Sequence, residues 1–159
     1  MQAKRLFLLP LILASFILGA IGAVRAADHA TILMYHRFGE DNYPSTNVRI
    51  EQFEAHLEIL ASGPYTVWPL QQIIDHLQTG KPVPDRTVAI TIDDAYLSVY
   101  EEALPRLKAR DFHATLFVAT RPVDRNLRGY MSWDQIREWQ AAWFGIGSQT
   151  QTHPHMHRL

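Results

Sequence analysis

The chain of 159 residues contains no cysteine, and this absence excludes several classes of protein at once. A disulfide scaffold, a cysteine-based zinc site, a thiol nucleophile and a lipid-modified cysteine all require that residue. Basic residues are not in excess, because 15 Lys and Arg stand against 16 Asp and Glu. Affinity for nucleic acid depends on clustered Lys and Arg, so no nucleic-acid partner is expected. The sequence also shows no internal repeat and no low-complexity tract.

The N-terminal segment has the features of a secretory signal peptide. A basic pair at residues 4–5 precedes an apolar stretch over residues 6–20, and residues 24–26 form a small-residue cleavage site. We therefore predict a signal peptide at 1–26, a single domain at 27–159, and a secreted or periplasmic location. The alternative is an uncleaved membrane anchor, although the apolar stretch is short for a membrane span.

Strand and helix patterns alternate along the remaining chain, which predicts one α/β domain with parallel strands. Short apolar or β-branched runs predict strands at residues 30–35, 65–68, 87–92, 115–119 and 144–148. Helical spacing of apolar residues predicts helices at 50–62, 69–79 and 97–109, and another beginning near residue 133. The strand at 30–35 is expected to be covered on both faces, and Pro105 is expected to kink or restart the third helix.

Polar residues follow three of these strands at the point where each one ends. His36 follows the first strand, Asp93 and Asp94 follow the strand at 87–92, and residues 149–153 follow the last. The carboxyl ends of parallel strands meet at one edge of the sheet, where α/β proteins commonly bind their ligands. We therefore expect these three groups to form one site.

Asp93 and Asp94 are adjacent carboxylates at the end of a buried strand. Neighbouring side chains in extended backbone point to opposite sides, so one could ligate a metal while the other accepts a proton. The same geometry argues against a glycosidase, whose two carboxylates face each other across a sugar at roughly 5 to 9.5 Å. The structural alternative is that one of the two only caps the following helix.

The C-terminal segment is rich in histidine. His153, His155 and His157 lie close together, and Gln149 precedes His153 by four residues. Imidazole together with carboxylate suits zinc, manganese, cobalt or nickel in a mixed nitrogen and oxygen site, which makes His153 a candidate metal ligand. His36 could join it. A solvated histidine tail, and a purely structural His36, are the alternatives.

Three segments together resemble a known family. They are MYH at residues 34–36, TIDDA at 91–95 and IGSQTQTHPHM at 146–156. They resemble the NodB-homology polysaccharide deacetylases of carbohydrate esterase family 4, which include the chitooligosaccharide deacetylases. The resemblance implies the N-terminal portion of a distorted (β/α) barrel. It also implies a metal-dependent hydrolase that removes N-acetyl groups from polysaccharides or oligosaccharides containing N-acetylglucosamine.

The resemblance also assigns roles to individual residues. In the family motif TFDDG the first Asp is the catalytic base and the second is a metal ligand, so these roles fall to Asp93 and Asp94. A second motif of the form H-[ST]-x-x-x-H supplies two histidine ligands, of which the last corresponds to His153. The implied cofactor is a divalent metal ion, with zinc expected and manganese, cobalt or nickel as alternatives.

The sequence departs from the family pattern at three positions. Gln149 stands where the second motif begins with histidine, and a glutamine oxygen is a poorer zinc ligand than imidazole. We therefore expect weaker metal binding, an oxygen-preferring metal, or a replacement ligand such as His36 or His155. Ala95 and Asp111 stand where glycine is usual. Asp111 is expected to close its helix in left-handed backbone at some energetic cost.

The later motifs of the family, which carry an arginine, a tyrosine and a general-acid histidine, have no counterpart before Leu159. The chain is therefore expected to correspond to the N-terminal part of the catalytic domain and to be truncated. One alternative is a non-catalytic carbohydrate-binding or metal-binding protein on the same scaffold. The other is a truncated product without stable function, whose unpaired last strand would be prone to aggregation.

Overall fold

The computed structural model describes residues 26–154. The predicted signal peptide, apart from Ala26, lies outside these residues, as do His155 and His157. Within the described part of the chain, none of the helices is long and apolar enough to cross a membrane.

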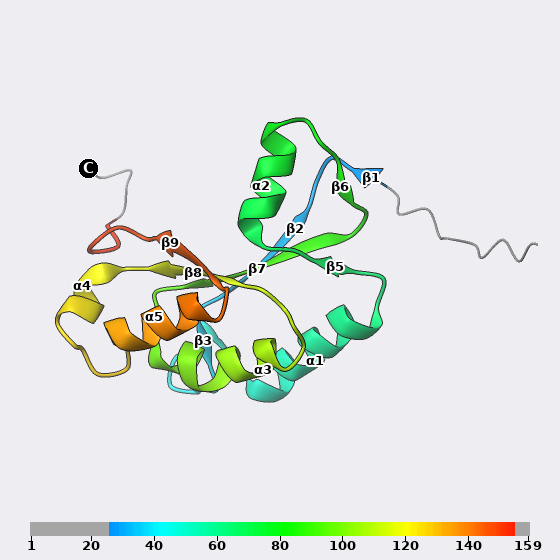
Figure 1. The fold of residues 1–159 in the computed structure, drawn as a ribbon. Coiled ribbons are helices and arrows are strands. Elements are labelled where there is room, and N and C mark those ends of the chain that lie inside the picture. Colours follow the sequence, from blue (N-terminus) through cyan, green and yellow to red (C-terminus); the bar gives the residue numbers. More distant parts are fainter. Residues whose placement is uncertain (1–25, 155–159) are drawn as a thin grey trace, which may run out of the picture.

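The fold is built on one parallel sheet with helices packed against it (Figure 1). Its central strand, β7 (Thr87–Asp93), is buried at six of its seven residues. β2 (Thr31–Tyr35) pairs with β7 on one side, and β5 (Thr66–Val67) and β8 (Thr115–Val118) pair with it on the other. β9 (Gly145–Ser148) extends the sheet beyond β8. The predicted α/β class and the parallel arrangement are confirmed.

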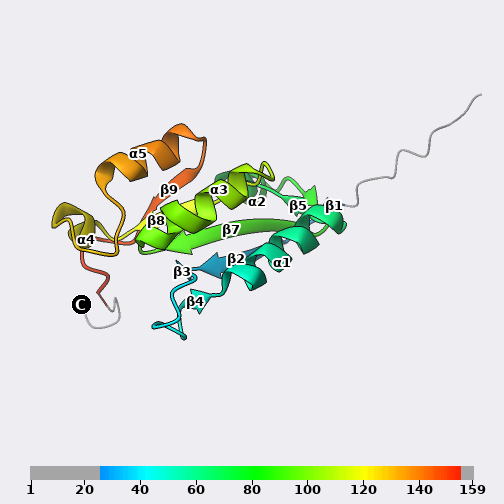
Figure 2. The ribbon, with the colours of Figure 1, turned by 90° about the horizontal axis from the view of Figure 1, so that it is seen from below.

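Helices cover the two faces of the sheet unequally. α1 (Ile50–Ser62), α3 (Leu104–Lys108) and α5 (Trp133–Ala141) lie along one face, and α2 (Leu70–Gln78) lies on the other side (Figures 1 and 2). The main core lies between the three helices and the inward side chains of the sheet, including Ile90 and Ile92 of β7. A smaller core forms where α2 meets the opposite face of the same strand.

Pro105 restarts a helix, as the sequence predicts. A π-helical turn, η1 (Val99–Ala103), leads into α3, and Pro105 stands in the first turn of α3. At that place the missing N–H of proline costs no helical hydrogen bond. α4 (Thr120–Asp124) was not predicted, because five residues are too short for a recognisable helical period.

Two short strand pairs were also not predicted. β1 (Ala26–Ala27) pairs antiparallel with β6 (Val83–Pro84), and β3 (Arg37–Phe38) pairs parallel with β4 (Asn47–Val48). Each strand has only two residues, so no alternation of polar and apolar side chains marks it in the sequence.

A capping box fixes the start of α5. The N–H of Gln135 donates to Ser132 Oγ at 3.2 Å, and the N–H of Ser132 donates to Gln135 Oε1 at 2.8 Å. Met131 and Ile136, which flank the box, are both buried. The predicted helix start near residue 133 is confirmed by these contacts.

The expectation that β2 is covered on both faces is wrong. Leu33 and Tyr35 pack into or against the main core, but Ile32 is 53% exposed and Met34 is 62% exposed. Ile32 and Met34 border an open pocket of about 580 Å³, which is also lined by Ile59 of α1. Among the described residues, β2 and β9 each pair with one neighbour only, so the sheet is open at both edges.

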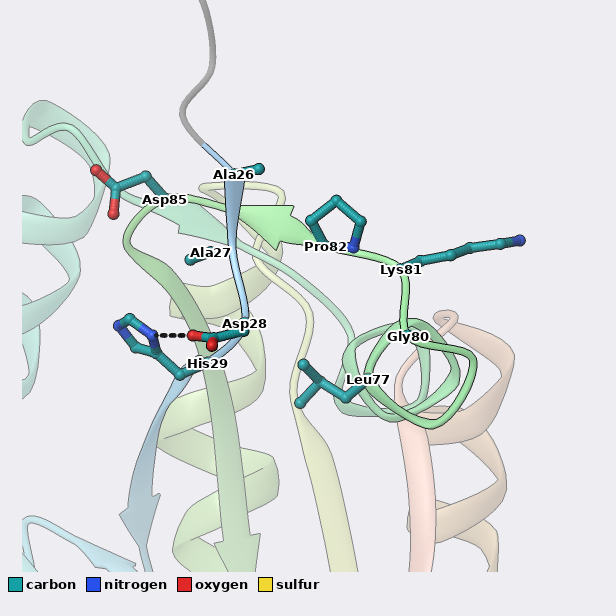
Figure 3. Close-up of a pocket in the computed structure, with 9 residues that line it drawn as sticks. All are labelled: Ala26, Ala27, Asp28, His29, Leu77, Gly80, Lys81, Pro82 and Asp85. Atoms are coloured by element: carbon teal, nitrogen blue, oxygen red, sulfur yellow. Dashed lines mark hydrogen bonds and ion pairs between the residues drawn. The ribbon is translucent and has the colours of Figure 1, made fainter.

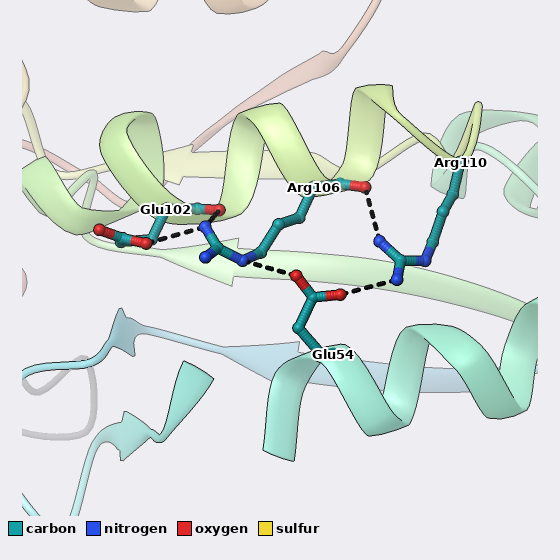
Figure 4. Close-up of polar contacts among 4 residues, drawn as sticks. All are labelled: Glu54, Glu102, Arg106 and Arg110. Carbon is teal, nitrogen blue, oxygen red and sulfur yellow. Dashed lines mark hydrogen bonds and ion pairs between the residues drawn. The ribbon is translucent and has the colours of Figure 1, made fainter. Parts of the chain in front are cut away.

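A shared carboxylate joins α1 to α3 (Figure 4). Glu54 Oε1 lies 2.9 Å from Arg106 Nε, and Glu54 Oε2 lies 2.7 Å from Arg110 Nη2. Arg106 also pairs with Glu102 at 2.8 Å. Both arginine side chains are only 25% exposed, so solvent screens these pairs less than it screens pairs on the open surface.

We predict that Glu54→Gln lowers the free energy of unfolding by about 1 kcal/mol, because two partly buried guanidinium groups lose their common anion. Chemical denaturation of both proteins measures the difference. Arg137→Gln is the control, since it removes an exposed ion pair with Asp134 and should change stability by less than about 0.5 kcal/mol. Equal effects of the two substitutions would contradict the assignment.

Asp111 adopts the left-handed backbone that the sequence predicts, with φ 54°. Its N–H donates to Lys108 O at 3.2 Å, and the next N–H, of Phe112, donates to Leu107 O at 3.1 Å. These bonds close the end of α3 and hold Asp111 in a conformation that favours glycine.

Asp111→Gly is expected to raise the free energy of unfolding by about 0.5 to 1 kcal/mol, because the strain of the left-handed residue is relieved. Thermal or chemical denaturation tests this directly. Ala109→Gly, two residues earlier at ordinary helical φ, should lower stability by a similar amount. Destabilisation by both substitutions would show that the strain at Asp111 is negligible.

Candidate active site

The three groups of polar residues that were predicted to meet do lie together. His36 follows β2, Asp93 is the last residue of β7, and Gln149 follows β9, with His153 four residues further on. Figure 2 shows β2 and β7 running toward the same end of the molecule as α4, with β1 at the opposite end. The site therefore lies at the carboxyl edge of the sheet, where α/β folds place their ligands.

Asp93 contacts His36 and Gln149. Its Oδ2 lies 3.8 Å from His36 Nε2 and accepts a hydrogen bond from Gln149 Nε2 at 3.4 Å. The Asp93 side chain is only 14% exposed, and this burial raises the pKa of its carboxyl group. The positive charge available at His36 and the bond from Gln149 act in the opposite direction without cancelling the rise.

Asp94 has different partners because the backbone changes direction after β7. Its φ of 75° is left-handed, so the extended geometry expected from the sequence ends at Asp93. Asp94 Oδ1 lies 3.9 Å from His153 Nε2, while the Asp94 N–H donates to Phe117 O at 2.9 Å. The two adjacent carboxylates are therefore directed to separate neighbours.

Left-handed backbone is concentrated at this site. Asp94, Ala95, Thr150 and His153 all have φ between 52° and 75°, a region that non-glycine residues rarely adopt. Hydrogen bonds hold these residues in place: Met131 N–H donates to Ala95 O at 2.9 Å, and His153 N–H donates to Thr150 Oγ1 at 3.1 Å. Strain maintained by surrounding structure is typical of functional sites.

Gln149 contacts His153, the Asp93 carboxylate and the backbone of Asp94. Its Oε1 accepts from the Asp94 N–H at 3.3 Å, and its Nε2 lies 3.4 Å from Asp93 Oδ2 and 2.8 Å from His153 Nε2. The amide cannot be turned around without placing its NH₂ against the Asp94 N–H and its oxygen against the Asp93 carboxylate. This orientation is therefore fixed by the neighbours.

The donor atoms of Asp94 and His153 suit a divalent metal ion. A carboxylate oxygen of Asp94 and a ring nitrogen of His153 lie 3.9 Å apart, and both atom types are ligands in mixed nitrogen and oxygen sites. Across residues 26–154, no three His, Asp or Glu side chains gather at one point. His36 lies against Asp93 rather than Asp94. His155 is outside the described residues.

A cluster formed by Arg37, Glu40 and two tyrosines was not recognised in the sequence. The Arg37 guanidinium lies 3.4 Å from the centre of the Tyr96 ring and 3.8 Å from that of Tyr43, and it pairs with Glu40 at 2.6 Å. Burial and the nearby charge of Asp94 raise the pKa of the Tyr96 hydroxyl, which keeps it neutral. The only available signal was that Arg37 directly follows the MYH segment.

A separate pocket lies at the amino-terminal edge of the sheet. It has a volume of about 690 Å³ and lies between β1 and the end of α2 (Figure 3). Asp28 and His29 pair with each other at 3.0 Å, while Lys81 extends away from them. The polar groups of this pocket do not converge on one point, so we place the candidate active site at the carboxyl edge.

The class of protein follows from comparison with known sequences. A family model described as polysaccharide deacetylase matches residues 80–159, which include Asp93, Asp94 and His153. The chain belongs to this family, as the resemblance in its motifs predicted.

A curated relative matches most of this chain, but the match covers only part of the relative's length. YxkH of Bacillus subtilis (strain 168), which is named as a polysaccharide deacetylase, is 32% identical over 126 residues. Those residues are 79% of this chain and 43% of YxkH. The chain therefore spans less than half the length of this curated relative.

Solved structures agree on the fold. The structure of IcaB from Ammonifex degensii is 30% identical with a TM-score of 0.68, and the match covers 77% of this chain and 53% of IcaB. A de-N-acetylase from Aggregatibacter actinomycetemcomitans has a TM-score of 0.67 at 23% identity, covering 76% of this chain and 53% of that protein. The described fold is thus similar to about half of each of these structures.

Proposed function

We propose that this chain carries the base and the metal-binding residues of an enzyme that removes N-acetyl groups from saccharides containing N-acetylglucosamine. One observation carries the proposal: within the family-matched region, Asp93 and Asp94 are adjacent yet face different partners. A hydrolytic site needs such a division, because the group that accepts a proton from water should not also be neutralised by a metal.

In this mechanism Asp93 acts as general base. Its carboxylate, free of a metal partner, accepts the proton of the attacking water while His36 stays beside it. Asp94 and His153 would hold a divalent ion, zinc or alternatively manganese, cobalt or nickel, which when bound supplies Lewis acidity to the N-acetyl carbonyl. The products are acetate and a glucosamine unit.

The substrate class and location follow from the same reasoning. Chitin oligomers, peptidoglycan and poly-N-acetylglucosamine all present the required N-acetyl group. Such polymers lie outside the cytoplasm, which is consistent with a signal peptide at residues 1–26 and a partial deacetylase domain at 27–159. Cleavage after Ala26 would leave Ala27 paired with Val83 of β6.

A second function is favoured by Gln149. Its NH₂ group lies 2.8 Å from His153 Nε2, where a metal-binding site would have a ligand atom. This arrangement favours a site that does not use a metal for catalysis. A non-catalytic carbohydrate-binding or metal-binding protein on the same scaffold would retain the site geometry without turnover.

The proposed base is tested by Asp93→Asn in the full chain with N-acetylglucosamine oligomers as substrate. The substitution preserves size but removes the proton acceptor, so acetate release should fall by about 100-fold or more. Asp75→Asn, at an exposed position on α2, is the control and should leave the rate unchanged.

Two results would count against the assignments. An unchanged rate in Asp93→Asn would show that another group is the base. Binding of the oligomer without release of acetate by the unmodified chain would instead support the non-catalytic function.

Export is tested by the mass and N-terminal sequence of the mature protein. We expect processing after Ala26, so that the protein begins at Ala27. Replacing Ala26 with Arg should block processing, because the cleavage site requires a small residue. An N-terminus at Met1 in the recovered unmodified protein would contradict the predicted signal peptide.

A further inference from the structure

Gln149 carries an inference that rests on the proposed metal site and goes beyond it. A side-chain amide nitrogen can donate hydrogen bonds but does not offer a lone pair to a metal. Here that nitrogen lies 2.8 Å from His153 Nε2, so His153 must accept the bond through its ring lone pair. The same lone pair is the one with which His153 would bind an ion.

The competing bond is part of a complete network. Gln149 Oε1 receives the Asp94 N–H, and Gln149 Nε2 also approaches Asp93 Oδ2 at 3.4 Å. The backbone N–H of Gln149 donates to Val118 O at 3.0 Å, which fixes the residue against β8. An ion that binds His153 must therefore displace a donor held by several contacts.

The alternative orientation of the amide does not remove this cost. Turning Oε1 toward His153 would present an oxygen ligand to an ion, but it would also bring that oxygen against the Asp93 carboxylate. The NH₂ group would then face the Asp94 N–H, which is itself a donor. Both unfavourable contacts disfavour the turned orientation of the Gln149 amide.

We infer that Gln149 is an internal competitor of the metal: its amide holds His153 and Asp93 in a hydrogen-bonded site and lowers affinity for divalent ions. Asp94 and His153 remain the ligands, and the hydrogen bond from Gln149 determines how readily His153 becomes free to bind an ion. A net hydrogen bond contributes about 1 kcal/mol, which corresponds to roughly fivefold in affinity.

The test is zinc affinity of the full chain and three variants, measured by competition with a chromophoric chelator. Gln149→Leu has a similar size but neither donates nor accepts, so it should bind zinc about fivefold more tightly than the unmodified chain. Gln149→Glu replaces the donor by a carboxylate oxygen and should bind about 100-fold more tightly. His153→Ala removes a ligand and should lose most of the affinity.

The outcomes separate this inference from the metal site itself. If Gln149→Leu binds zinc as the unmodified chain does, or more weakly, Gln149 is no competitor and the inference is wrong, even where His153→Ala still abolishes binding. If neither the unmodified chain nor Gln149→Glu binds zinc, both the inference and the metal assignment to Asp94 and His153 fail.

A measurement on the unmodified protein covers the case in which a variant does not fold. Zinc titration followed by NMR should shift the side-chain NH₂ signals of Gln149 in step with the ring signals of His153. Unchanged Gln149 signals during binding at His153 would contradict displacement of the amide.

Discussion

The structure depends on the buried central strand β7 and on how it ends. Thr87 to Ile92 are buried by neighbouring strands and by helices on both faces, so the path of the strand is determined by packing. A residue at its exit is positioned by that packing, and Asp93 is held there with little exposure. Asp94 then adopts left-handed backbone, and its carboxylate lies near His153 while that of Asp93 lies near His36.

The main elements of the fold could be predicted because apolar periodicity reflects burial. The strands and the longer helices followed from it, and Pro105 indicated where a helix restarts. The two-residue strands β1, β3, β4 and β6 and the five-residue helix α4 could not be predicted, since each is too short to show a recognisable pattern of apolar residues. The exposure of Ile32 and Met34 was also missed, because an apolar run does not show whether anything covers each face.

The site could be predicted in location but not in geometry. Parallel strands bring their carboxyl ends to one edge, so the meeting of His36, the two carboxylates and the segment after β9 followed from topology. From the sequence alone, Gln149 was expected only to be a poorer metal ligand than the histidine that is usual at this position. In the structure, the amide nitrogen of Gln149 lies next to His153. Gln149 therefore donates a hydrogen bond to this histidine and offers no metal ligand there.

Asp93 and Asp94 are assigned different roles, and their effects on divalent-ion affinity should therefore differ. Zinc binding should be measured for the full chain with Asp93→Asn and with Asp94→Asn, two variants that differ by one position. We expect Asp94→Asn to lower zinc affinity by about 100-fold and Asp93→Asn to leave it within about threefold. Equal losses in the two variants, or a larger loss in Asp93→Asn, would contradict these roles.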